Sequence, residues 1–295
     1  MKKYIITILT LFFLIILSIT GYFVYGSIKE NKANSIDTLK EKCKSEIEYV
    51  GDNIIVIMNE LNNISYTNSK IVSEKIEESS SSNQNSSIGT EEKENSNNQS
   101  SENQKNTITL NNMSATSILE KDNIDGVDWN SIEIKVQELY SSWTSIMIDL
   151  SSLNVNKENL LEFNNNLDRI SKGIEDKNKE VVLINSAELY NLLAKYANEF
   201  YNDKNEISLL NIESSILYSY AEIERSNWNK ASDYITKAKN EFSNIINNQV
   251  NNINKIDIIN KAYVLINELE EDCNNNERKI FLINYSNLIQ ELQNI

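Results

Sequence analysis

The spacing of apolar residues predicts helices along most of this chain. Apolar positions recur at alternating intervals of three and four, the repeat of one helix face, and the two-residue alternation of a strand does not fit. The sequence contains no proline and only six glycines, so few positions interrupt regular structure. We therefore predict an all-α fold.

The first apolar segment, residues 5–24, carries no charge. Twenty helical residues extend roughly 30 Å, which matches the hydrocarbon core of a bilayer. We predict that residues 1–26 form a transmembrane signal anchor, with cleavage after Gly26 left open. Lys2 and Lys3 favour a cytoplasmic N-terminus, although several lysines soon after the segment oppose this orientation. The expected localisation is the cell membrane, single-pass, with the C-terminal domain extracytoplasmic.

The next segment, residues 27–76, is predicted to be a long juxtamembrane amphipathic helix. Its near-heptad stripe is typical of a coiled coil, but two successive steps of four break a strict repeat. The helix can pair with a second copy as a homodimer or fold back onto the distal helices, and we favour folding back. The stripe consists of Ile36, Leu39, Cys43, Ile47, Val50, Ile54, Ile57, Leu61 and Ile64.

The two cysteines, Cys43 and Cys273, both lie on apolar stripes. Each fits as a small apolar residue on a helix face. If the juxtamembrane helix folds back, the same positions allow a Cys43–Cys273 disulfide in an exported protein, which mild oxidation would form. The sequence does not decide between a pair of free thiols and this disulfide.

Residues 77–107 are rich in Ser, Asn and Glu and contain one apolar residue, Ile88. Such a composition cannot bury enough surface to offset the entropy of ordering, so we predict a disordered polar linker. Residues 108–295 are predicted to form an antiparallel helical bundle that folds on its own, because short polar turns separate seven apolar stripes. The stripes begin near Trp129, Leu160, Val182, Leu209, Trp228, Ile259 and Phe281.

The composition argues against several classes of partner and of catalytic site. The net charge of −15 and the pI near 4.6 argue against a nucleic-acid partner and against electrostatic docking onto anionic lipid. The absence of histidine removes the commonest general base and transition-metal ligand. We therefore expect no enzyme, no catalytic, cofactor-binding or metal-binding residues, and no cofactor. The abundance of asparagine is explained by AT-rich coding bias.

Two local patterns and the three tryptophans are candidate functional sites. Residues 122–128 contain Asp-Gly but fail the spacing of an EF-hand loop, so Asp128 is predicted to be a helix N-cap. Residues 216–238 resemble one tetratricopeptide hairpin, yet no second copy follows at a 34-residue period. Trp129, Trp143 and Trp228 lie on apolar stripes and are predicted to be core residues.

The layout of anchor, polar linker and tryptophan-bearing distal bundle resembles membrane-anchored or lipoprotein-like proteins of AT-rich Gram-positive bacteria. That resemblance implies a cell-envelope location and nothing about activity. We predict a non-enzymatic, membrane-anchored, envelope-facing helical protein for protein–protein interaction or self-assembly. The alternative is an extracytoplasmic sensor domain for a small ligand or cation, acting through a separate partner. A pocket closed by tryptophans, or carboxylates pointing inward, would favour the alternative.

Overall fold

The computed structural model describes residues 35–64, 126–249 and 255–295. The described residues form eight helices and no strand, which confirms the all-α prediction. The predicted anchor at 1–26 and linker at 77–107 lie outside them. No helix in the described part of the chain is both long and apolar enough to span a bilayer. The helices are the one at 35–60, then α4 (Trp129–Ser152), α5 (Lys157–Glu175), α6 (Lys179–Phe200), α7 (Lys204–Glu224), α8 (Trp228–Gln249), α9 (Ile256–Asn275) and α10 (Arg278–Leu292).

Polar residues in the short turns start these helices. Asp128, Asn156, Asn178 and Asp203 each accept hydrogen bonds from backbone N–H groups in the first turn of α4, α5, α6 and α7. These bonds satisfy donors that a helix N-terminus leaves without an intrahelical partner. The prediction that Asp128 is an N-cap is confirmed. Short turns between long helices make successive helices antiparallel.

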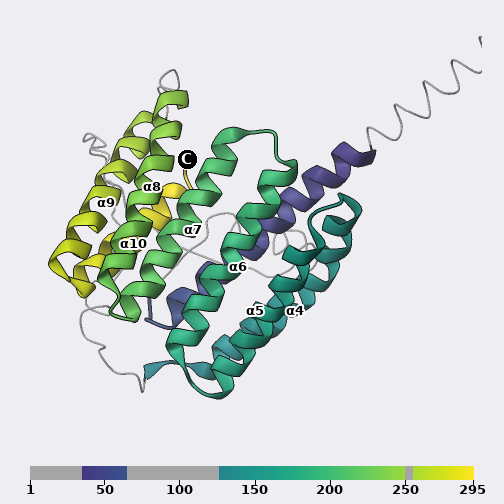
Figure 1. Cartoon of the computed structure of the whole chain (residues 1–295), viewed down its shortest axis with the longest axis horizontal. Coiled ribbons are helices and arrows are strands. Elements are labelled where there is room, and N and C mark those ends of the chain that lie inside the picture. The colour runs from purple at the N-terminus through teal and green to yellow at the C-terminus, as the bar shows by residue number, and fades with distance from the viewer. Residues whose placement is uncertain (1–34, 65–125, 250–254) are drawn as a thin grey trace, which may run out of the picture.

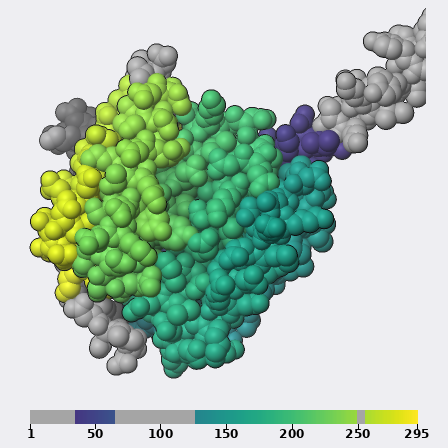
Figure 2. All heavy atoms as spheres, viewed as in Figure 1, coloured from purple at the N-terminus to yellow at the C-terminus, as the bar shows by residue number. Residues whose placement is uncertain are grey.

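The seven helices α4 to α10 form a curved array (Figure 1). Each helix packs against the next one in the chain, and α10 also returns to contact α7. Figure 2 shows α5, α6, α7 and α8 covering the viewed face, where only the start of the 35–60 helix is visible. Within the α7–α8 hairpin, the Ser219 hydroxyl donates a hydrogen bond of 3.0 Å to the Ala231 carbonyl. This contact joins the two helices of the segment that resembles a tetratricopeptide hairpin.

The 35–60 helix, called the central helix below, lies among four helices of the array. Lys42 pairs with Asp149 of α4, and the Tyr220 hydroxyl of α7 donates to the Met58 carbonyl. On the α10 side, the Tyr285 hydroxyl donates to the side chain of Asn59. On the α6 side, a Cβ added at Gly51 would lie 3.1 Å from the Tyr190 ring. Glycine at position 51 therefore allows α6 to approach closely.

Burial of the central helix is wider than one stripe. Seven of the nine predicted stripe residues, from Cys43 to Ile64, are buried, while Leu39 is partly buried and Ile36 is exposed. Ile55, Met58 and Asn59, which lie off the stripe, are buried as well. A helix buried on several faces is surrounded by neighbours rather than laid on a surface. The folded-back arrangement is therefore the one that the structure shows for residues 35–64.

The burial of the central helix changes the predicted domain division. The sequence divided residues 27–76 from 108–295, whereas the described residues 35–64 share one hydrophobic core with α4 to α10. The segment 65–125 consequently connects two parts of the same core, and independent folding of 108–295 is no longer expected. Cys43 and Cys273 are both buried and free. Cys43 lies near Asp149 of α4 and Cys273 near Ser219 of α7, so of the two possibilities that the sequence leaves open the structure shows the pair of free thiols.

The three tryptophans differ in how deeply they are buried. Trp143 is buried, stacks on Phe163 with ring centroids 3.7 Å apart, and donates its indole N–H to Asn164. Its predicted core role is confirmed. Trp129 and Trp228 are only partly buried and pack against the edge of the core. Trp129 is therefore available to line a surface hollow.

Candidate functional site

A buried polar cluster fixes the C-terminal end of the central helix. The Asn62 side-chain carbonyl accepts hydrogen bonds from Lys179 and Arg278, and its amide donates to the Tyr220 hydroxyl. Two cations at the end of a helix also interact favourably with its macrodipole. Tyr285 adds a hydrogen bond of 2.9 Å to Asn59 one turn earlier. The contacts determine the position of the helix along its axis.

Glu224 neutralises the two cations of this cluster. Its carboxylate is 2.8 Å from the Lys179 ammonium and accepts two hydrogen bonds from Arg278, at 2.8 and 3.1 Å. Burial acts to raise the pKa of Glu224, but Lys179 and Arg278 outweigh burial and the net effect is a lowered pKa. Burial lowers the pKa of Lys179, with Glu224 opposing that change. Since every partner belongs to the fold, the cluster has a structural role.

An acidic cavity of about 240 Å³ lies beside the middle of the central helix. Its carboxylates come from segments far apart in the chain, namely Glu48 and Asp52 of the central helix and Glu206 and Glu213 of α7. The cavity is closed by Tyr190, Tyr201, Leu209, Leu210, Leu292, Gln293 and Ile295.

Contacts among the lining residues shape the acidic cavity. Tyr190 donates its hydroxyl hydrogen to Glu213, and Lys44 pairs with Glu206. The Tyr201 hydroxyl donates to the Lys44 carbonyl at 3.3 Å, and burial raises the pKa of Tyr201. Among the described residues that line the cavity there are four carboxylates and no lysine or arginine, which favours a cationic occupant over an anionic one. Apolar walls beside these carboxylates suit the carbon chain of an organic cation.

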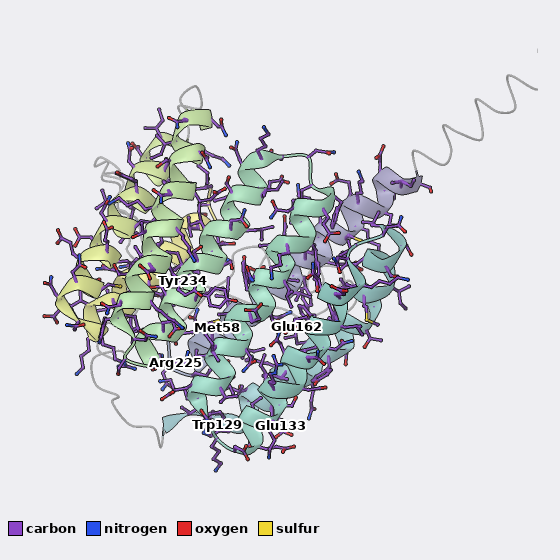
Figure 3. The ribbon with its side chains drawn as sticks, in the orientation of Figure 1. Met58, Trp129, Glu133, Glu162, Arg225 and Tyr234 are labelled. Atoms are coloured by element: carbon purple, nitrogen blue, oxygen red, sulfur yellow. The ribbon has the colours of Figure 1, made fainter. Side chains whose placement is uncertain are left out.

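A second hollow of about 300 Å³ lies between the start of α4 and the end of α5. Trp129, Glu133 and Tyr140 line it from α4, and Glu175 and Lys177 line it near the turn after α5. We call it the Trp129 hollow. Figure 3 shows Trp129 and Glu133 together at one end of the molecule. Tryptophan and tyrosine are among the side chains that most often anchor protein partners.

The Trp129 hollow lies toward the C-terminal end of the central helix, whereas the acidic cavity lies beside the middle of that helix. Lys135, near the start of α4, pairs with Glu60 at the C-terminal end of the central helix. Asp149, near the end of α4, pairs with Lys42 at its N-terminal end. Helix α4 therefore runs antiparallel to the central helix, and its Trp129 end is far from residue 35.

The sequence predicts no site residue and neither hollow. The acidic cavity joins residues that are more than 150 positions apart, such as Glu48 and Glu206, so no local motif marks it. The Trp129 hollow had one signal, a tryptophan at the first position of a helix, which was assigned to the core. In the described residues, no group of three or more Cys, Asp or Glu is arranged to hold a metal ion.

Comparison of this chain with protein-family models, with curated proteins and with solved structures gives no match.

Proposed function

We propose that this protein is a non-enzymatic, membrane-anchored helical module that faces the cell envelope and binds a protein partner or a second copy of itself. The apolar segment at 5–24 supplies the anchor in this proposal. The central helix begins eleven residues after Val24 and forms the core of the bundle, which supports a rigid unit held directly at the membrane.

The observation that carries the binding role is the Trp129 hollow. It combines Trp129 and Tyr140 with Glu133, Glu175 and Lys177 at the end of the bundle away from residue 35. Aromatic residues that stay partly accessible contribute much of the binding energy at protein interfaces. A hollow at the far end of an anchored bundle would meet partners in the envelope.

Site-specific photocrosslinking tests this role in intact membranes. A photoreactive amino acid replaces Asn130, an exposed residue that lines the Trp129 hollow, and in a matched protein it replaces Asn244, an exposed residue of α8. We expect a discrete crosslinked product from position 130 only, and its loss when Trp129→Ala is added. Equal products from both positions, or none from 130, would contradict a binding role for this hollow.

A second function is favoured by the acidic cavity. We propose as the alternative that a small organic cation binds between Glu48, Asp52, Glu206 and Glu213, so that the bundle acts as a sensor through a separate partner. Two tyrosines and three leucines supply apolar walls for such a ligand. The cavity volume suits a short amine rather than a drug-sized molecule.

Titration of the full chain with a short diamine tests the alternative. The diamine should raise the unfolding temperature of the native protein, because a ligand that binds only the folded state stabilises it. Glu48→Gln should abolish the increase, whereas Glu175→Gln, in the other hollow, should retain it. An increase that is the same in both variants would indicate non-specific charge binding.

A further inference from the structure

One edge of the bundle carries exposed apolar side chains where the chain leaves toward residue 34. Ile36, in the first turn of the central helix, is 40% exposed. Ile148 of α4 and Leu161 of α5 are each 63% exposed. These three residues define what we call the Ile36 edge.

Two contacts place Ile148 and Leu161 at the Ile36 end of the molecule. Asp149 of α4 pairs with Lys42 of the central helix, so Ile148 lies at the level of the second turn of that helix. The turn at 153–156 then connects α4 to α5, and Leu161 follows one helical turn after α5 begins. The three apolar residues therefore occupy the same end of the bundle although three helices contribute them.

The length of chain before this edge limits its distance from a membrane. Residues 25–34 separate the apolar segment at 5–24 from the central helix. Ten residues span at most about 35 Å when fully extended. If residues 5–24 cross a bilayer, the Ile36 edge is the part of the bundle that must remain close to its surface.

We propose that the Ile36 edge rests on the bilayer surface and inserts Ile36, Ile148 and Leu161 among the lipid headgroups. This orientation rests on the anchor in the proposed function. It turns the Trp129 hollow away from the membrane, because Trp129 lies at the opposite end of α4 from Ile148. Exposed apolar residues also occur at that opposite end, so the position of the chain exit, rather than exposure alone, selects the edge.

The charges near the Ile36 edge favour apolar insertion over electrostatic binding as the way in which this edge contacts the bilayer. Near this edge Lys42 and Lys44 are paired with Asp149 and Glu206, and Lys40 and Lys157 are each followed by a glutamate. The chain carries a net charge of −15. Binding through a polybasic surface would require anionic lipid and would weaken in salt. Insertion of apolar side chains depends on neither.

Helix α4 supplies a matched pair of positions for the test. Ile148 is 63% exposed and Ile134 is 57% exposed, so the two side chains are similarly accessible. They lie about 21 Å apart along one helix, at 1.5 Å per residue. Lys135, next to Ile134, contacts Glu60, which places Ile134 at the end of the central helix away from Ile36.

The full chain carrying Ile148→Cys or Ile134→Cys is labelled with a fluorescent maleimide and reconstituted into phosphatidylcholine vesicles containing headgroup spin-labelled lipid. Cys43 and Cys273 are buried, and the unsubstituted chain measures their background labelling. We expect the label at 148 to lose most of its fluorescence and the label at 134 to keep it. Replacing half of the phosphatidylcholine with phosphatidylglycerol should leave this difference unchanged.

Each other outcome has a distinct meaning. Failure of the chain to float with vesicles would contradict the proposal that residues 5–24 anchor it. The proposed orientation of the bundle, which rests on that anchor, would then be wrong as well. Flotation with equal quenching at 148 and 134, or stronger quenching at 134, overturns the orientation while the anchor stands. Flotation without quenching, combined with a disulfide-linked dimer of the Ile148→Cys chain, assigns the edge to self-contact and also overturns the bilayer contact. Quenching that appears only with phosphatidylglycerol overturns apolar insertion.

Discussion

The two ends of the central helix are held by different kinds of interaction. At the C-terminal end, Asn59 and Asn62 enter a buried cluster in which Glu224 has two cationic partners. At the N-terminal end, Lys42 and Lys44 form surface pairs with Asp149 and Glu206, and apolar packing around Cys43 holds the helix. Buried hydrogen-bonded charges tolerate no missing partner, whereas exposed pairs are screened by water and salt. The C-terminal end therefore fixes the alignment of the helix, and the N-terminal end mainly contributes buried area.

The largest effect on stability is expected from removing the whole central helix. A fragment of residues 108–295 lacks the central helix, which leaves the inward faces of α4, α6, α7 and α10 without cover. We expect the fragment to lose the cooperative thermal transition that the full chain shows by circular dichroism. A cooperative transition at the temperature of the full chain would show that the array does not need the central helix.

Arg278→Met should weaken the C-terminal end most among single substitutions. Glu224 would lose two hydrogen bonds while remaining buried, with Lys179 as its remaining partner. Breaking a buried pair is strongly destabilising, and allowing for the partial exposure of Arg278 we expect a loss of about 2 kcal/mol in urea unfolding. Lys172→Met, which removes an exposed cation of α5 paired with the exposed Glu175 and Asp176, is the control and should leave the unfolding midpoint nearly unchanged.

Alkaline pH should destabilise the protein through its two buried thiols, Cys43 near the N-terminal end of the central helix and Cys273 on α9. Burial raises the pKa of Cys43 from 9.0 to about 11 and that of Cys273 from 9.0 to about 12. A raised folded-state pKa leaves stability unchanged below the unfolded value near 9, and stability falls as pH rises toward the folded value. The free energy of unfolding measured in urea should thus be constant from neutral pH to about 9 and should decrease above it. A decline that starts well below pH 9 would contradict this assignment.

Tyr285→Phe should have a smaller effect, because it removes one hydrogen bond and keeps the ring. The side-chain carbonyl of Asn59 would remain buried without that donor. We expect a loss of about 1 kcal/mol in the free energy of unfolding. Tyr49→Phe changes an exposed tyrosine of the same helix and serves as the control. Equal effects of the two substitutions would mean that the buried hydrogen bond adds nothing to stability.

Lys42→Met should have the smallest effect. Its side chain is 55% exposed, so water and salt screen the pairs with Glu46 and Asp149. We expect the same urea midpoint as the unsubstituted protein at low and at high salt. A marked loss at low salt would show that the N-terminal end is also aligned by charge.

The distal helices could be predicted from the sequence because each carries its own apolar stripe and polar turn. The α4 stripe from Ile132 to Leu150 is buried, and Asp128 caps the helix. The central position of the 35–60 helix was not predicted, although five consecutive apolar residues at 54–58 exceed what one stripe requires. Asn59 and Asn62 were attributed to coding bias, since their partners lie more than 100 positions away. The hollows depend on the same distant contacts.

The order of segments in the chain has a consequence for folding kinetics. The central helix precedes the helices that surround it, and the contact between Asn59 and Tyr285 joins residues 226 positions apart. Forming this contact requires closing a long loop, and the entropy of loop closure is lost before the native contact forms. During synthesis the apolar central helix emerges before the helices that surround it, and its enclosure must wait until α10 is complete. The central helix is therefore exposed during synthesis and needs protection from aggregation.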